Sequence, residues 1–178
     1  MQIIGLAAMS LDGFITRGNE PGTAFTSPED KAWFREVTKD FSVKIMGRRT
    51  FEVSREYILQ QIEHGDRSSR FVLTSNPSAH KAFQKPGSLE FTNRNPEQIV
   101  NQLSETHADA KIAVLGGGAV YSAFLNANLL DEFWITLEPK IFGTGTPIVT
   151  EPSMNKLTLI ETHNLGPSTL LLKYRCKS

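Results

Sequence analysis

The chain of 178 residues is 39% hydrophobic and 21% charged, a composition typical of one soluble globular domain with a full core. Nineteen basic residues balance nineteen acidic ones, so the net charge of zero excludes a broad electrostatic footprint for nucleic acid or an anionic membrane. Cys176 is the only cysteine, which excludes an intrachain disulfide, and the four histidines show no metal-binding spacing.

Residues 1–178 are expected to form a single domain, because no shift in composition marks a second one. No apolar run approaches the roughly 18 residues of a membrane span, and the first residues lack the positive flank of a signal peptide. We therefore expect a cytoplasmic protein without nucleic-acid or membrane partners.

Apolar runs along the chain predict a mixed α/β sheet. Six of them predict strands, at residues 2–8, 43–46, 71–73, 89–91, 112–115 and 133–137. Capping residues and helical spacing predict four helices, which begin near Pro28, Phe51, Pro96 and Gly118. Residues 157–165 and 169–176 flank a Gly-Pro-Ser turn and predict a C-terminal β-hairpin. In such a sheet, ligands bind at the carboxyl ends of the strands.

The first predicted helix contains an acid with two interpretations. Ser27 is its N-cap, and Asp30, three residues later, could complete a capping box. Asp30 also projects on the apolar face, where a desolvated carboxyl with a raised pKa can bind or protonate a ring nitrogen. The spacing leaves both interpretations open. The apolar positions of this helix predict a buried stripe of Trp33, Phe34, Val37 and Phe41.

A glycine-rich turn joins the strand at 112–115 to the next helix. Gly116, Gly117 and Gly118 lack a Cβ, so the backbone can turn sharply and bring its N–H groups close to a ligand. The N-terminus of the following helix favours negative charge, which suits the phosphates of a dinucleotide. A purely structural turn is the alternative, because Tyr121 stands where the Rossmann pattern has its third glycine.

A second strand-to-helix turn carries cations. The sequence G-R-R-T at 47–50 follows the strand at 43–46 and supplies two guanidiniums and a hydroxyl, which suit a diphosphate or a ribose phosphate. A solvated basic turn is the alternative interpretation. Thr74 and Ser75 likewise follow the strand at 71–73, so hydroxyl groups lie at its carboxyl end as well.

Four segments in collinear order resemble the dihydrofolate reductase superfamily: P-E-D-K-A-W-F at 28–34, M-G-R-R-T-F-E at 46–52, F-V-L-T-S at 71–75 and V-L-G-G-G-A-V-Y at 114–121. The segment S-L-D-G-F-I at 10–15 and the end of the chain are similar to its other branch, the reductase domain of riboflavin biosynthesis, or RibD C-terminal domain. The resemblance covers essentially the whole chain. It implies a single-domain dihydrofolate reductase-like α/β fold, in which a mixed, mostly parallel eight-stranded sheet is flanked by helices and its last strand is antiparallel.

NADPH is the cofactor that this resemblance implies. The residues implied for its nicotinamide and phosphates are Ala8, Ile15, Gly47, Arg48 and Thr50. Those implied for its adenosine are Leu73, Thr74 and Ser75, with Ser75 and Arg48 near the 2′-phosphate. The residues implied to cradle the diphosphate and nicotinamide are Leu115, Gly116, Gly117, Gly118 and Tyr121.

For catalysis, the resemblance places Asp30 on the family's one pocket acid and Thr136 on the threonine hydrogen-bonded to it. Lys31 and Phe34 would contact the substrate, although Lys31 replaces an apolar folate contact.

The folate half of the pattern fits less well than the cofactor half. Ser68 occupies the place of the arginine that holds the folate tail, with Arg67 and Arg70 displaced to either side. Residues 51–69 are longer than in the folate enzymes and read as helix. A phosphorylated substrate would suit Lys31, Arg67 or Arg70, and the sequence leaves the choice among them open.

We therefore expect an NADPH-dependent reductase that transfers hydride to a small heterocycle, of the 5-amino-6-(5-phosphoribosylamino)uracil reductase type. The alternatives are a dihydrofolate or pteridine reductase, and a non-catalytic nucleotide-binding protein that keeps the cofactor turns. The riboflavin-type relatives are dimers, and the apolar terminal hairpin needs a cover, so a homodimer is expected.

Overall fold

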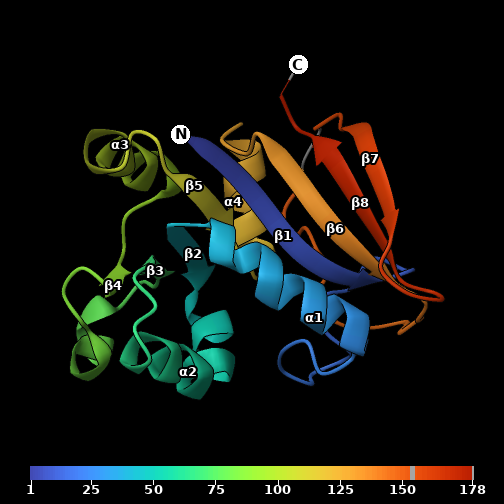
Figure 1. Cartoon of the computed structure of the whole chain (residues 1–178), viewed down its shortest axis with the longest axis horizontal. Coiled ribbons are helices and arrows are strands. Elements are labelled where there is room, and N and C mark those ends of the chain that lie inside the picture. Colours follow the sequence, from blue (N-terminus) through green and yellow to red (C-terminus); the bar gives the residue numbers. More distant parts are fainter. Residues whose placement is uncertain (153–154, 178) are drawn as a thin grey trace.

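One eight-stranded sheet organises the protein, with the strand order β4-β3-β2-β5-β1-β6-β8-β7 (Figure 1). The computed structural model describes residues 1–152 and 155–177. The strands are β1 Gln2–Ser10, β2 Val43–Gly47, β3 Ser69–Leu73, β4 Leu89–Thr92, β5 Lys111–Val114, β6 Glu132–Glu138, β7 Thr158–Asn164 and β8 Leu170–Arg175. Pairing is parallel from β4 to β6, whereas β8 is antiparallel to both β6 and β7. The predicted fold class, a mostly parallel sheet with a C-terminal hairpin, is confirmed.

Helices cover both faces of the sheet. Helices α1 (Pro28–Val37) and α2 (Arg48–Glu63) lie on one face, and α3 (Pro96–Thr106) and α4 (Gly118–Asn126) lie on the other (Figure 1). Two short 3-10 helices complete the fold, η1 (Thr38–Asp40) and η2 (Pro77–Phe83).

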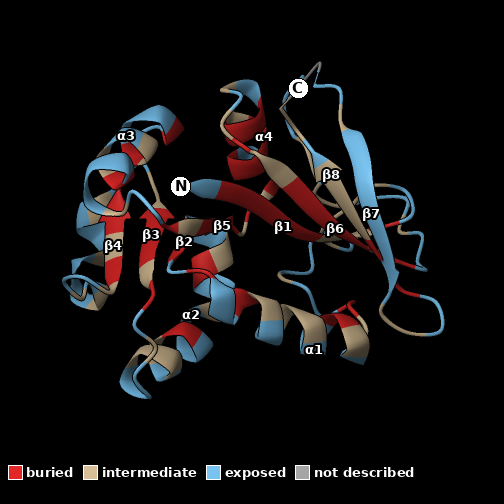
Figure 2. Ribbon diagram, turned by 45° about the horizontal axis from the view of Figure 1, so that its top comes forward, coloured by how far each residue is buried: buried red, intermediate tan, exposed pale blue. Residues whose placement is uncertain are grey.

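Strand β1 shows why the apolar runs do not alternate. Ile3 and Ala7 belong to the buried cluster under α3 and α4, whereas Ile4 and Leu6 pack in the cluster under α1. Both faces of a central strand are thus covered, and both must be apolar. Figure 2 shows this burial along β1 and its neighbours.

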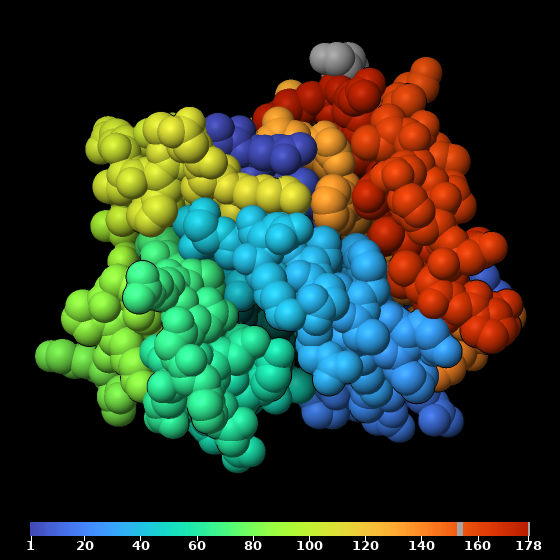
Figure 3. Space-filling model, in the orientation of Figure 1, coloured from blue at the N-terminus to red at the C-terminus, as the bar shows by residue number. Residues whose placement is uncertain are grey.

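Helix α1 is less buried than its sequence predicted. Trp33, Phe34 and Val37 are only half-buried, and Phe41 lies beyond the end of the helix. The helix packs one flank on the cluster that contains Ile4, while its other flank borders a recess between α1 and α2 (Figure 3). The only buried residue of α1 is Asp30.

The two strands of the terminal hairpin differ in burial, because β8 lies between β6 and β7 whereas β7 is the edge strand. Strand β7 is exposed along its whole length (Figure 2). Leu159 and Ile160 are 51% and 39% exposed. In the described ranges, no helix combines the length and the apolar character needed to span a bilayer.

Candidate active site

The two predicted cofactor turns meet at one edge of the sheet. Gly47 ends β2 and Gly116 follows the adjacent strand β5, and the Gly47 N–H donates to the Gly116 carbonyl at 2.7 Å. A Cβ built on Gly117 would lie 3.8 Å from both Ile15 Cδ1 and Thr50 Oγ1. Five residues expected around the nicotinamide and diphosphate are therefore gathered together.

The space for a side chain differs among the three glycine positions of the turn. Gly116 has a φ of +83°, and a Cβ there would lie 2.6 Å from the ring of Tyr121. A Cβ on Gly118 would lie 2.5 Å from the carbonyl oxygen of Pro147. Gly117 has an ordinary φ of −70° and no atom nearer than 3.8 Å to a built Cβ. The purely structural interpretation thus explains Gly116 and Gly118, whereas the absent side chain of Gly117 leaves room for a ligand.

Tyr121 packs against this turn at Gly116. Its ring is buried, its hydroxyl donates to the Leu6 carbonyl, and burial raises its pKa. Leu115 precedes the turn and is held by its N–H, which donates to the Ile45 carbonyl at 2.8 Å. Direct contact of Leu115 and Tyr121 with a cofactor stays a prediction.

The residues expected around the adenosine follow β2 and its neighbour β3. Arg48 is exposed at the start of α2 and pairs with Glu52, with contacts of 2.8 and 3.0 Å. Leu73 ends β3, Thr74 is half-buried and Ser75 is exposed. Since β2 and β3 are parallel, both groups lie at the same edge of the sheet. Their binding to a ribose phosphate stays a prediction.

Asp30 is the buried acid of helix α1. It is 6% exposed, and its carboxyl faces the hydroxyls of Thr26 and Thr136. Desolvation by burial raises its pKa, which those hydroxyls lower and the charge of Glu138 raises further. Within the part of the chain that the structure describes, neither hydroxyl forms a hydrogen bond of standard geometry. The carboxyl is thus buried between the start of α1 and strand β6, and its role as a pocket acid stays a prediction.

Of the two hydrogen bonds that a capping box of Ser27 and Asp30 would contain, one is present and the other is not. Ser27 caps α1 by accepting the Asp30 N–H at 3.1 Å, as predicted. The reciprocal bond is made by Glu138, whose Oε1 accepts the Ser27 N–H at 2.9 Å and the Ser27 hydroxyl at 3.0 Å. The Asp30 carboxylate is not needed at the cap, because a carboxylate from β6 already occupies it.

The register of β1 and β6 places the threonine that faces Asp30 beside a residue of the predicted cofactor site. Ala8 of β1 pairs with Thr136 of β6. Ala8 was expected to line the nicotinamide, and Thr136 faces Asp30. The two halves, predicted separately, are thus adjacent at the carboxyl ends of β1 and β6.

The residues expected to contact the substrate differ in exposure and in the bonds that they already form. Phe34 is half-buried against the cluster under α1, and Lys31 is exposed and lowers the pKa of Asp30 by its charge. Arg70 is 1% exposed and donates to Asp66 at 2.5 Å and to the Ser68 carbonyl at 2.8 Å. Arg70 is therefore a structural cation, and the candidates left for a substrate phosphate are Lys31 and Arg67.

Two acids near the site were not among the predicted site residues. Asp12 accepts the N–H groups of Phe142 at 3.1 Å and Gly143 at 2.7 Å, which fixes the loop after β1 to the segment after β6. Glu138 lies two residues after Thr136, and the period of a strand places both on one face, a signal that the sequence did contain.

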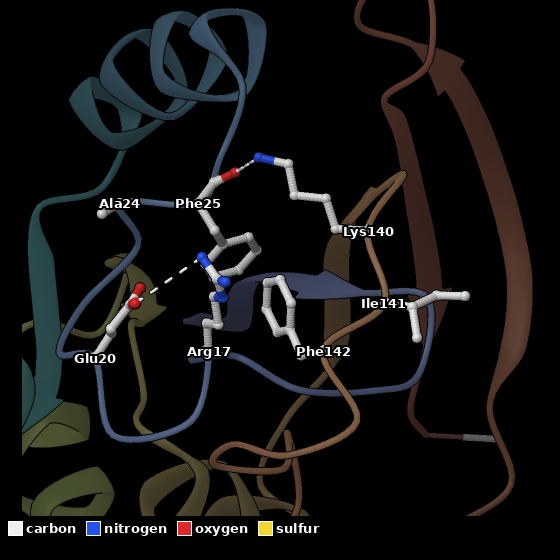
Figure 4. Close-up of a pocket in the computed structure, with 7 residues that line it drawn as sticks. All are labelled: Arg17, Glu20, Ala24, Phe25, Lys140, Ile141 and Phe142. Carbon is white, nitrogen blue, oxygen red and sulfur yellow. Dashed lines mark hydrogen bonds and ion pairs between the residues drawn. The ribbon is translucent and has the colours of Figure 1, made fainter.

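A cavity of about 510 Å³ opens beside these acids (Figure 4). It lies between the loop after β1 and the segment after β6, and Lys140 crosses it to donate to the Phe25 carbonyl. Its lining residues are Arg17, Glu20, Ala24, Phe25, Lys140, Ile141 and Phe142, none of which was expected to bind cofactor or substrate.

Comparison with known proteins gives relatives in sequence and in fold. The chain is 24% identical over 180 residues to the uncharacterised protein YyaP of Bacillus subtilis (strain 168), covering 94% of this chain and 90% of that protein. The fold is similar to that of a putative riboflavin biosynthesis protein from Shewanella sp. PV-4, with a TM-score of 0.74, 20% identity and full coverage of both chains.

A second solved structure is similar over part of its length. It is a diaminohydroxyphosphoribosylaminopyrimidine deaminase/5-amino-6-(5-phosphoribosylamino)uracil reductase from Thermotoga maritima, with a TM-score of 0.74 and 17% identity. The match covers 99% of this chain and 56% of that one. The sequence profile of the RibD C-terminal domain family matches residues 2–171. The chain, with its dihydrofolate reductase-like fold, therefore belongs to the RibD C-terminal domain family.

Proposed function

We propose that the protein is an NADPH-dependent reductase that transfers hydride to a small pyrimidine-like heterocycle. The observation that carries this proposal is the pairing of Ala8 with Thr136, which puts the glycine turns and the buried Asp30 at one edge of the sheet. A dinucleotide site and a proton donor side by side are what a hydride transfer to a C=N or C=O bond requires.

The cofactor would be held by the residues gathered around Gly117. The N-terminus of α2 and the glycine turn would meet its phosphates, and Ile15 and Ala8 would border its nicotinamide. Bound NADPH would supply the hydride. The part of the protein is to orient the ring and exclude water, for which the half-buried Ile15 and Ala8 are suited.

Asp30 would supply or organise the proton. Its raised pKa keeps a larger fraction of the carboxyl protonated at a given pH than an exposed aspartate would have. Phe34, one turn later on α1, and Lys31 would contact the substrate ring and its substituents.

The substrate class follows from the family. The Thermotoga maritima relative is named as a 5-amino-6-(5-phosphoribosylamino)uracil reductase, and we propose that same reaction type for this chain. Burial of Ser68 and Arg70 supports this over a folate substrate, because neither can hold the carboxylate tail of folate.

Turnover assays test the proposal directly. NADPH oxidation should be fast with 5-amino-6-(5-phosphoribosylamino)uracil and slow with dihydrofolate, and Asp30→Asn serves as the inactive control. Efficient use of dihydrofolate would instead favour the folate alternative. Thermal stabilisation by NADPH without turnover of any pyrimidine or pterin would favour a nucleotide-binding protein.

We also propose a homodimer that covers the exposed strand β7. Leu159 and Ile160 are apolar and exposed on this edge strand, a position that invites association. Sedimentation should give twice the chain mass of 19.8 kDa, and Leu159→Lys should give the monomer. Ile141→Lys, at a 74% exposed apolar residue elsewhere, is the matched control and should leave the mass unchanged. A monomer for the unaltered protein at micromolar concentration contradicts this proposal.

A further inference from the structure

A buried carboxylate outside the predicted site borders Asp30. Glu138 is 1% exposed, and its Oε1 accepts both donors of Ser27, the N–H at 2.9 Å and the hydroxyl at 3.0 Å. The Ser27 hydroxyl in turn accepts the Asp30 N–H at 3.1 Å and the Thr169 hydroxyl at 3.2 Å. These bonds join the start of α1, the end of β6 and the segment before β8.

Both hydrogen-bond donors of Ser27 are bonded to Glu138, and this determines where the Asp30 carboxylate can lie. An acid at the third position of a helix ordinarily returns its carboxylate to the N–H of the N-cap residue. That N–H is already bonded to Glu138. The Asp30 carboxylate thus finds no free donor at the cap and faces Thr26 and Thr136 instead.

We infer that Glu138 is a positioning residue for Asp30: by holding the N–H and hydroxyl of Ser27, it keeps the Asp30 carboxylate out of the helix cap and directed into the site. This inference rests on the proposed role of Asp30 as the pocket acid. The bond from Lys140 to the Phe25 carbonyl supports it, because it ties the segment before Ser27 to the segment after Glu138 (Figure 4).

The charges around Asp30 give the inference a measurable consequence. The charged groups that face Asp30 are Glu138 from β6 and Lys31 from its own helix. Glu138 disfavours ionisation of Asp30 and Lys31 favours it, in addition to the larger effect of burial. Removing the charge of Glu138 should therefore lower the pKa of Asp30.

Glu138→Gln is the first test variant, since the amide oxygen can still accept the Ser27 N–H. With ¹³C in the aspartate side-chain carboxyls, NMR should show the titration midpoint of Asp30 falling by about one pH unit. Glu132→Gln makes the same substitution at the other end of β6 and should leave the midpoint unchanged. An unchanged midpoint in folded Glu138→Gln, or equal shifts in both variants, overturns the inference.

Glu138→Ala removes the acceptor of the Ser27 N–H as well as the charge, so comparison with Glu138→Gln shows the effect of the acceptor alone. With no acceptor from β6, the Asp30 carboxylate should close onto the Ser27 N–H, and this bond should lower its midpoint beyond that of Glu138→Gln. A midpoint in the alanine variant equal to or above that in Glu138→Gln would show that Glu138 does not keep Asp30 out of the cap.

A measurement on the unaltered protein covers the case in which these variants fail to fold. The carboxyl resonance of Glu138 should change its chemical shift at the midpoint of Asp30, and Asp30→Asn should abolish this change. A Glu138 resonance that does not respond at the midpoint of Asp30 refutes the coupling. None of these titrations needs turnover, so a failed reductase assay with the expected shifts rejects the proposed function alone, and turnover without the shifts rejects only the inference.

Discussion

Two polar clusters lie on the α1 and α2 side of the sheet, at opposite ends of its strands. Near the amino ends of β2 and β3, Asp66 pairs with Arg70 at 2.5 Å and Lys44 at 3.2 Å. Burial raises the pKa of Asp66, but hydrogen bonds from Ser68 and the two cations outweigh this and hold it well below its usual range. At the carboxyl ends, Asp30 is buried, no cation of residues 1–152 or 155–177 forms a salt bridge with it, and its pKa is raised.

The difference contrasts a carboxylate that is bonded to cations with the one that we propose to be functional. A buried charge is stabilised by paired cations, and at the amino ends the protein supplies them. An unpaired buried carboxylate lowers the free energy of unfolding. Such groups occur most often at sites that bind a ligand. The cluster of Asp30 lies at the strand ends where ligands bind in such sheets, whereas the cluster of Asp66 does not.

The largest expected effect concerns catalysis. Asp30→Asn keeps the shape of the side chain and leaves the backbone bond to Ser27 in place. Steady-state turnover should fall by roughly two to four orders of magnitude, with NADPH affinity nearly unchanged, because a positioned proton donor is lost. If the Asp30 carboxyl has only a structural role, turnover should remain at the level of the unaltered protein.

The reverse pattern is expected at the other cluster. Asp66→Asn should lower the free energy of unfolding by about 3 kcal/mol, because Arg70 and Lys44 keep their buried charges without a counter-charge. Turnover of the folded fraction should be unaffected. Glu63→Gln removes an exposed acid 3.9 Å from Lys85 and should cost less than about 0.5 kcal/mol in urea unfolding. Similar losses in the two variants would show that burial of the pair does not matter.

The pH dependence of stability should differ in sign between the two acids. The lowered pKa of Asp66 gives stability that is present above the ordinary aspartate value, about 3.9, and is lost as the pH falls. The raised pKa of Asp30 has the opposite effect, a penalty that grows as the pH rises from about 4 through its folded pKa. Relative to the unaltered protein, Asp30→Asn should gain unfolding free energy above that pH. A difference independent of pH would contradict this assignment.

The smallest effect on stability is expected at an exposed pair, Arg48 and Glu52. Such a pair contributes little to stability, so Arg48→Ala should change the unfolding free energy by about 0.5 kcal/mol or less. If Arg48 binds the 2′-phosphate, calorimetry should show NADPH affinity reduced roughly 10- to 100-fold and NADH affinity unchanged. Glu52→Gln, which frees the guanidinium, should not weaken NADPH. Equal losses for both cofactors would remove Arg48 from the phosphate site.

The sequence contained the elements and their order, because these depend on neighbours along the chain. Caps such as Ser27, apolar runs and the glycine turn are local signals, and collinear motifs added the family. Half of the Asp30 assignment was also local, since helical spacing alone put the acid on the apolar face of α1.

Only the tertiary structure decided which distant groups meet. Register between β1 and β6 brought Ala8 to Thr136, and the end of β6 delivered Glu138 to a helix cap 111 residues away in sequence. Burial also removed Arg70 from the list of substrate contacts. Such outcomes depend on strand order and on long-range packing rather than on local propensity, so no pattern of neighbouring residues could have fixed them.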